Sequence, residues 1–333
     1  MRQPRLLLCV VALATTAVLV QAQNAAVTVT VDAAADRRPI NPAIYGVAFA
    51  TTAQLQDLRA PLNRSGGNAA SRYNWQVNAD NRGSDWYFES IADTSAVAGE
   101  RGDTFVTASR AGGAQPMLTV PTIGYIATVN GTRSKIASFD SRVYGAQDSC
   151  DTQWFPQACN GLRGGVPITG NNPLDANIAN APSVQAAWAS HLVQTFGLAA
   201  AGGLRYYILD NEPSLWHETH RDVRPIGATM DDTRDALIAY SAAIKSVDPG
   251  AMLAGPEEWG WSGYFYSGYD QQYGNAHGWS ALPDRQAHGN ADYLPWLLQQ
   301  LKARSDLDGR RVLDVVTAHF YPQGGEFWPA GDV

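Results

Sequence analysis

Cysteine and histidine are scarce in this sequence, which holds 3 Cys and 6 His among its 333 residues. It has no His-Glu-x-x-His pattern, and no third cysteine or histidine stands near the two later cysteines to complete a zinc site. The glycine-rich patterns of phosphate-binding and dinucleotide-binding loops are missing as well, which argues against nucleotide-dependent folds. We therefore expect no required cofactor and no catalytic metal.

Basic residues are also few, with 24 Lys and Arg against 31 Asp and Glu, a formal charge of -7. Nucleic-acid binding needs basic patches, so no nucleic-acid partner is expected. Aromatic residues are plentiful instead, with 10 Trp and 14 Tyr. Aromatic rings pack against the apolar faces of sugar rings, so this composition favours a glycan ligand, and core packing is the alternative use.

Long apolar runs are missing except at the N-terminus. Arg2 and Arg5 precede the apolar stretch 6–20, and Val20-Gln21-Ala22 resembles a cleavage site. Residues 1–22 are expected to be a secretory signal peptide, with an uncleaved anchor as the alternative. The mature protein is expected to be extracellular with no membrane partner.

Cleavage of the signal peptide leaves Cys150 and Cys159, which in a secreted chain predict a disulfide across a short loop.

Beyond the leader, segments of strand character and helix character alternate, which is typical of a parallel α/β sheet. Six strands are expected, with crossover helices between them. A doubly wound sheet is possible, but polar and aromatic residues recur at the carboxyl ends of the strands, so we favour a (β/α)8 TIM barrel. The expected strands are 44–50, 61–64, 116–120, 204–209, 251–255 and 312–320, and the expected helices are 54–58, 103–111, 183–196, 231–246 and 293–303.

Glu212 is the strongest catalytic candidate in the sequence. It follows the apolar run 204–209, and Pro213 ends that strand directly behind it. A carboxyl group at this end of a barrel strand lies where barrel enzymes place their chemistry, and aromatic walls could raise its pKa for work as a general acid. A solvated acidic loop is the alternative.

Other strand ends carry residues suited to binding sugar. For each tryptophan core packing is the alternative, Arg64 could instead pair with a core carboxylate, and His319 could be a satisfied core histidine. The expected substrate-binding residues are Arg64, Asn68, Trp75, Tyr125, Asn211, Trp216, Glu258, Trp259, Trp261, His319 and Tyr321.

A family resemblance runs from about residue 41 to 321. The blocks are Leu62-Asn63-Arg64-Ser65-Gly66-Gly67-Asn68, Tyr73-Asn74-Trp75, Gly83-Ser84-Asp85-Trp86-Tyr87, Thr119-Val120-Pro121-Thr122-Ile123-Gly124-Tyr125, Ile168-Thr169-Gly170-Asn171, Leu209-Asp210-Asn211-Glu212-Pro213, Gly255-Pro256-Glu257-Glu258-Trp259-Gly260-Trp261 and His319-Phe320-Tyr321-Pro322. In this order they resemble glycoside hydrolase family 44.

The resemblance implies a secreted endo-β-1,4-glucanase that cleaves cellulose derivatives or xyloglucan with retention. Glu212 would be its general acid/base. The strictly alternating segment Val27–Val31, within residues 23–40, would add a strand to a small β-sandwich, and residues 41–333 would supply the first six strand-helix units of the barrel. A structural calcium is possible, its ligands unplaced, and a monomer is expected.

Retention requires two carboxyl groups, and in the family the nucleophile ends the seventh barrel strand. No seventh strand is recognisable before Val333, so the chain is expected to be truncated and its nucleophile absent. Glu326 reads as a solvated loop residue, and Glu257 or Glu258 is a weaker candidate nucleophile. A glycan-binding protein without hydrolytic activity, or an inactive fragment, is the alternative function.

Overall fold

The computed structural model describes residues 27–321, so the expected signal peptide 1–22 and Glu326 lie outside the described residues. The chain divides into two units, Met1–Asn41 and Pro42–Val333. In the first unit, the described residues contain a turn but no strand or helix. The strand expected at Val27–Val31 is not formed in this structure, because no described strand pairs with it and its valines remain exposed.

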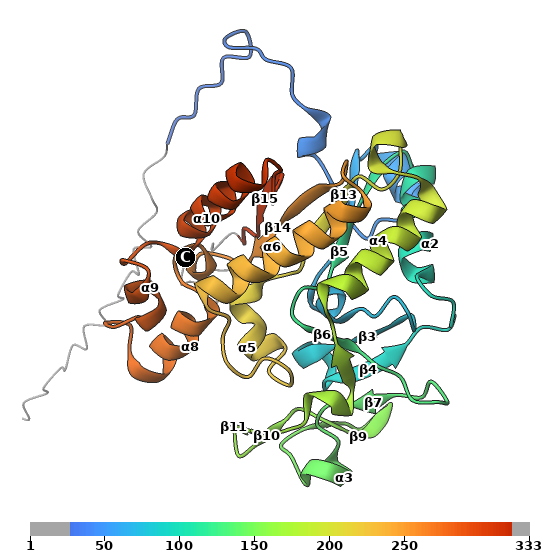
Figure 1. The fold of residues 1–333 in the computed structure, drawn as a ribbon, viewed down its shortest axis with the longest axis vertical. Coiled ribbons are helices and arrows are strands. Elements are labelled where there is room, and N and C mark those ends of the chain that lie inside the picture. Colours follow the sequence, from blue (N-terminus) through green and yellow to red (C-terminus); the bar gives the residue numbers. More distant parts are fainter. Residues whose placement is uncertain (1–26, 322–333) are drawn as a thin grey trace, which may run out of the picture. The chain divides into compact units, whose positions relative to one another are not determined.

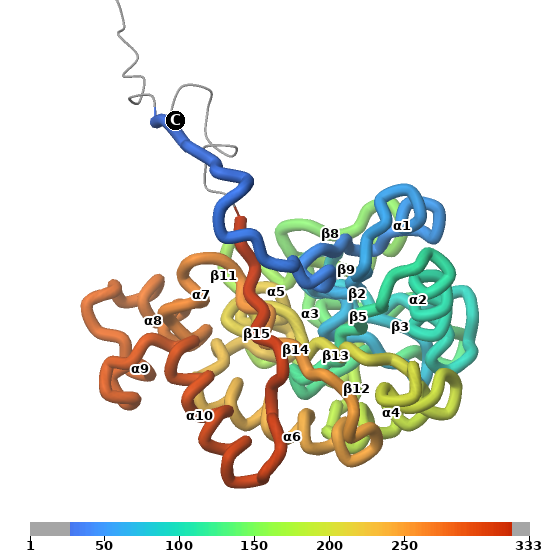
Figure 2. The backbone as a smooth tube through the Cα atoms, turned by 90° about the horizontal axis from the view of Figure 1, so that it is seen from above, coloured from blue at the N-terminus to red at the C-terminus, as the bar shows by residue number. Residues whose placement is uncertain are grey.

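The second unit is built on a six-stranded sheet in which every pair of neighbours is parallel. The strands stand side by side in chain order and form a curved row (Figure 2). They are β1 (Val47–Ala48), β2 (Leu62–Ser65), β5 (Gln115–Val120), β13 (Tyr206–Leu209), β14 (Met252–Glu258) and β15 (Val315–Ala318). Parallel neighbours bring all their carboxyl ends to one edge of the sheet, as the sequence predicted.

One main helix lies in each crossover. α6 packs between α4 and α10 (Figure 1). The helix ends follow local chemistry: α1 and α6 begin with capping boxes at Thr51 and Thr229, and Gly309 takes a left-handed conformation after α10. These helices are α1 (Thr52–Leu58), α2 (Glu100–Ala111), α4 (Pro182–Phe196), α6 (Met230–Val247) and α10 (Tyr293–Asp308).

The main core lies between the sheet and helices α2, α4, α6 and α10. Trp188 of α4, Tyr207 of β13 and Tyr293 of α10 are its largest fully buried aromatic side chains. Burial of such rings dominates the energetics of a core, so these aromatic residues hold the strand ends in a fixed arrangement. No described helix is both long and apolar enough to cross a membrane.

The strand boundaries differ from expectation at β14. The strand continues through Glu258 instead of ending at Gly255, and its pairing with β15 shifts between Pro256 and Glu258. Glu257 is therefore the extra residue of a β-bulge, with φ 53°. Bulges re-aim side chains, which sequence periodicity alone does not reveal.

Excursions after β2 and β5 form small antiparallel sheets beside the carboxyl edge (Figure 1). The excursion after β5 closes on itself because β12 pairs with β6. The strands are β3 (Ala79–Asn81), β4 (Glu89–Ala92), β6 (Tyr125–Ala127), β7 (Ile136–Ala137), β8 (Cys150–Asp151), β9 (Phe155–Cys159), β10 (Leu162–Arg163), β11 (Val166–Pro167) and β12 (Asn177–Ala179). The short α-helices are α3 (Ser141–Tyr144), α5 (Trp216–Thr219), α7 (Ser262–Phe265), α8 (Gly268–His277) and α9 (Pro283–Ala287). The 3-10 helices are η1 (Pro42–Ile44), η2 (Asn68–Arg72), η3 (Gly83–Trp86), η4 (Pro173–Asp175), η5 (Ala199–Ala201) and η6 (Pro213–Leu215).

Cys150 and Cys159 form a disulfide that joins the two ends of the β8–β9 hairpin. Replacing both with serine is expected to lower the free energy of unfolding by about 2–3 kcal/mol, because the oxidised chain loses less entropy on folding. Urea unfolding of the two proteins measures this difference. Equal midpoints and slopes would show that the disulfide does not stabilise the fold.

Candidate active site

Glu212 lies directly after β13, where the chain turns away from the sheet. Its backbone is left-handed, with φ 49°, a strained conformation for a residue other than glycine. The turn is held by a hydrogen bond from the Glu212 amide to the Glu257 carbonyl at 3.0 Å and by Pro213, which starts η6. Strain of this kind persists where the surroundings enforce it, and here it directs the carboxyl group toward His319.

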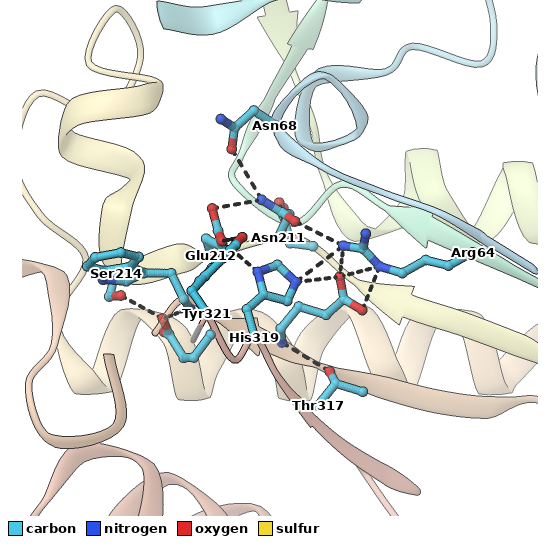
Figure 3. A network of polar contacts seen from close by, with 12 residues as sticks. Arg64, Asn68, Asn211, Glu212, Ser214, Thr317, His319 and Tyr321 are labelled. Atoms are coloured by element: carbon cyan, nitrogen blue, oxygen red, sulfur yellow. Dashed lines mark hydrogen bonds and ion pairs between the residues drawn. The ribbon is translucent and has the colours of Figure 1, made fainter. Parts of the chain in front are cut away.

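Glu212 is buried, with only 8% of the residue exposed. Its carboxyl group is held by three polar neighbours. His319 Nδ1 lies 2.5 Å from Oε1, and the Tyr321 hydroxyl donates to the same oxygen at 3.3 Å. Asn211 Nδ2 donates to Oε2 at 3.4 Å (Figure 3). The contacts to His319 and Tyr321, both placed just beyond β15, fix the rotamer of the carboxyl group.

Glu257 and Arg64 form the second part of the site. The Arg64 guanidinium binds both Glu257 oxygens, with Nε at 2.9 Å from each, and also donates to Asn211 Oδ1 at 3.1 Å. Burial raises the pKa of Glu257, but hydrogen bonds from His319 and Arg64 outweigh it and lower the pKa below its ordinary value. Glu257 is therefore a firmly held carboxylate.

His319 contacts both carboxyl groups, and Figure 3 shows its ring beside Glu212. Its Nδ1 faces Glu212, and its Nε2 is 3.4 Å from Glu257 Oε2. Burial opposes a charge on the imidazole, but the hydrogen bonds to Glu212 and Glu257 outweigh burial and raise the pKa of His319 to about 9. Arg64 and protonated His319 thus both stabilise the negative charge of Glu257.

The protonation of His319 predicts how the stability depends on pH. The raised pKa of His319, about 9 in the folded protein, exceeds the ordinary value of about 6.5, so its stabilising effect is complete below about pH 6.5 and is lost as the pH rises through about 9. The difference in Tm between wild type and His319→Gln should therefore shrink between neutral and alkaline pH. A difference that stays constant across this range would contradict the assignment.

Asn68 extends the site toward η3. Its side-chain oxygen accepts a hydrogen bond from Asn211 Nδ2 at 3.2 Å, and its own Nδ2 donates to the Asp85 carboxylate at 3.1 and 3.2 Å. Asp85 was not among the residues selected from the sequence, although it stands in one of the family-like blocks. The polar network thus continues from Glu212 into the neighbouring excursion.

Trp216 and Glu258 do not have the binding roles expected of them. Trp216 is 2% exposed, packs in a small core cluster, and donates its indole N–H to the Asn211 carbonyl. Glu258 is fully buried and accepts from Ser214 at 2.6 Å, and burial raises its pKa to about 7. Both predictions of substrate contact are wrong for this structure, since neither side chain is accessible to a sugar.

The other expected aromatic residues are spread around the strand ends. Trp75 packs against the core and donates to the Val184 carbonyl at 3.1 Å, so it supports the fold instead of the cleft. Tyr125 packs on the cluster that contains Trp216, and Trp259 is half-buried. Trp261 is widely exposed beside Tyr264, whose hydroxyl binds the His319 carbonyl at 2.5 Å.

No three His, Cys, Asp or Glu residues within 27–321 are grouped so that they could hold a metal ion. The chemistry available at the site is proton transfer by Glu212, positioned by His319, Tyr321 and Asn211, together with hydrogen bonding to hydroxyl groups.

Known proteins resemble this chain in sequence and fold. CelM2, described as a bifunctional glucanase-xylanase protein from a metagenome library, is 63% identical with a TM-score of 0.86 over 87% of this chain and 56% of that chain. A Paenibacillus polymyxa family 44 xyloglucanase, solved with xyloglucan, is 25% identical with a TM-score of 0.63 over 86% of this chain and 52% of that chain. Endoglucanase A of Paenibacillus lautus is 29% identical over 92% of this chain and 41% of its own length.

This chain therefore spans about half the length of the related structures. The sequence profile of glycoside hydrolase family 44 matches residues 79–324, which include Glu212, Glu257 and His319. The chain belongs to glycoside hydrolase family 44.

Proposed function

We propose that this protein cleaves internal β-1,4-glucosidic bonds of glucans such as xyloglucan and cellulose derivatives, with Glu212 as the general acid/base. One observation carries the proposal: Glu212 is held at the carboxyl end of β13 by His319, Tyr321 and Asn211. Endoglucanase A and the family 44 xyloglucanase support the substrate class.

In the proposed mechanism, Glu212 protonates the glycosidic oxygen of the leaving sugar. It then removes a proton from the water that resolves a glycosyl-enzyme intermediate, which gives retention. His319 and Tyr321 position its Oε1. Oε2 has only the long contact with Asn211, so Oε2 is the atom that would face the glycosidic bond.

Retention also needs a nucleophile roughly 5–5.5 Å from the acid/base. Glu257 does not suit this role, because both of its oxygens bind Arg64 and the His319 ring lies between it and Glu212. We assign Glu257 to positioning Arg64 and His319. The nucleophile we propose is a carboxylate outside the described residues, whose neighbour in the site would be Arg64.

The same proposal covers features beyond the site. The six parallel strands would be part of a (β/α)8 barrel, residues 23–40 would contribute to a β-sandwich, and residues 1–22 would direct secretion. An oxidising environment outside the cell would suit the disulfide between Cys150 and Cys159. A monomer is proposed for this protein.

The test uses the protein expressed from its complete reading frame. Reducing ends should be released from xyloglucan or hydroxyethylcellulose with a fast fall in viscosity, the mark of internal cleavage. Proton NMR should show the β-anomer of the new reducing end first, since retention conserves configuration. Initial release of the α-anomer would disprove retention, and glucan binding without cleavage would favour a non-hydrolytic glycan-binding protein.

A further inference from the structure

Two exposed tryptophans line a shallow hollow beside the active site. Trp154 is 63% exposed and Trp86 is 39% exposed. The hollow has a volume of about 510 Å³, and its other lining residues are Ala69, Arg82, Asp85, Ile91 and Lys135. Large exposed aromatic rings around a depression are typical of a binding surface, because leaving their apolar surface in contact with water is unfavourable.

One buried carboxylate holds the Trp86 ring and the turn that carries Trp154. Asp151 is 2% exposed, and its Oδ1 accepts from the backbone amides of Gln153 and Trp154 at 3.1 and 3.0 Å. Its Oδ2 accepts from the indole N–H of Trp86 at 3.3 Å. The turn that carries Trp154 and the side chain of Trp86 are therefore held by the same group, so little freedom is lost when a ligand binds.

The hairpin that carries Trp154 is anchored at a second and a third point. The disulfide joins Cys150 of β8 to Cys159 of β9, on either side of the turn. The Ser149 hydroxyl lies 3.2 Å from the hydroxyl of Tyr87, the residue after Trp86. The disulfide thus closes the hairpin, and the Ser149–Tyr87 contact ties it to the end of η3, the segment that leads back to the active site.

The hollow is continuous with the active site through polar contacts. Asp85 precedes Trp86 and lines the hollow, and it accepts from Asn68. Asn68 in turn accepts from Asn211, the residue beside Glu212. A polymer lying at Glu212 thus has a polar path along these side chains to the two tryptophans.

The charges around the hollow favour a neutral, hydroxyl-rich ligand. Arg82 is paired with Asp80 at 2.6 Å, and Lys135 is paired with Glu89 at 2.9 Å. Asp85 is exposed and would repel an anionic sugar, but it can accept from a hydroxyl group. A polymer rich in uronic acid is therefore disfavoured compared with a neutral glucan.

We propose that Trp86 and Trp154 form a remote glycan subsite, in which their rings stack on pyranose units of a neutral β-glucan chain whose scissile bond lies at Glu212. The disulfide-linked hairpin and Asp151 are the supports that keep this subsite formed in the absence of substrate. The inference rests on the proposed function and names a further binding site for its substrate.

The test compares Trp154→Ala with Trp154→Phe in the protein expressed from its complete reading frame. For xyloglucan and for the longest soluble cello-oligosaccharides, Trp154→Ala should raise KM about five- to tenfold, the range expected for one lost stacking contact. Turnover of a short aryl cellobioside should be unchanged, because it does not reach the hollow. Trp154→Phe keeps a ring and should recover most of the affinity.

Val143→Ala is the matched control, since Val143 is an exposed apolar residue of α3 in the same excursion. It should leave both substrates unaffected, and equal Tm values would show that all variants fold. Equal KM values for Trp154→Ala and wild type on long chains would overturn the subsite while the proposed function stands. A wild type that neither binds nor cleaves glucan would overturn both, and this outcome is recognisable without any variant.

Discussion

Glu212→Gln is expected to lower the hydrolysis of xyloglucan and cellulose derivatives by about 10²- to 10⁴-fold, the contribution typical of general acid–base catalysis. Glutamine keeps the size of the side chain but cannot protonate a leaving oxygen. Burial of the residue and its contacts with His319 and Tyr321 mean that water cannot easily replace it. Substrate affinity should survive, because the aromatic and amide residues remain.

The dependence on leaving group identifies the role. With Glu212→Ala, an aryl glycoside whose phenol leaves without protonation should still form the glycosyl-enzyme, and added azide should speed its breakdown to a β-glycosyl azide. Glu218→Gln is the control, since Glu218 is an exposed residue on the neighbouring α5. If Glu212→Gln retained wild-type turnover on polymer, or if azide gave no adduct, Glu212 would not be the acid/base.

Arg72→Met is expected to lower the free energy of unfolding by about 3–5 kcal/mol, the cost typical of breaking a buried ion pair on one side. Arg72 and Asp222 are both fully buried and form a bidentate pair at 2.9 and 2.9 Å. Ser138 also donates to Asp222 at 2.6 Å. The pair joins η2, which follows the strand of Arg64, to the segment after α5, so its loss should loosen both sides of the cleft.

The double variant Arg72→Met/Asp222→Leu gives the decisive comparison. It leaves no unpaired charge, so it should be more stable than Arg72→Met alone. Arg304→Met removes an exposed pair with Asp308 one helical turn away and should change stability by no more than about 0.5 kcal/mol. Urea unfolding of wild type and the three variants measures these free energies of unfolding. A loss of stability in Arg72→Met as small as that in Arg304→Met would contradict the prediction.

Much of the sheet could be predicted from the sequence, because its signals are local. The apolar run before Glu212 forms β13, and the alternation of strand and helix character gives the six parallel strands in their order. Helix ends such as that of α10 follow from the capping behaviour of a single glycine. At Val27–Val31 the alternation predicts a strand, but the described residues provide no strand that pairs with it, so this element stays a prediction.

Some of the residues selected from the sequence as site candidates lie together in the structure. Arg64, Asn211, Glu212, His319 and Tyr321 were selected for their positions at strand ends, and the structure brings all five into one network. Trp216 was selected by the same reasoning, yet it turns inward and packs against Ile123 and Val223. Chain position places a residue near the edge of a sheet, but the direction of its side chain depends on how the following turn packs.

The order of the strands, the family, and the placement of Glu212 at a carboxyl end could be predicted from the amino-acid pattern, because hydrophobic pattern and turn residues act over a few neighbours. The opposite environments of two adjacent carboxyl groups depend on long-range packing: Glu257 faces Arg64, while Glu258 is buried against Ser214. The physical reason is the bulge in β14. Neighbouring strand residues point to opposite faces, and the shift in pairing with β15, which lies about sixty residues further along the chain, sets which carboxylate reaches the cleft.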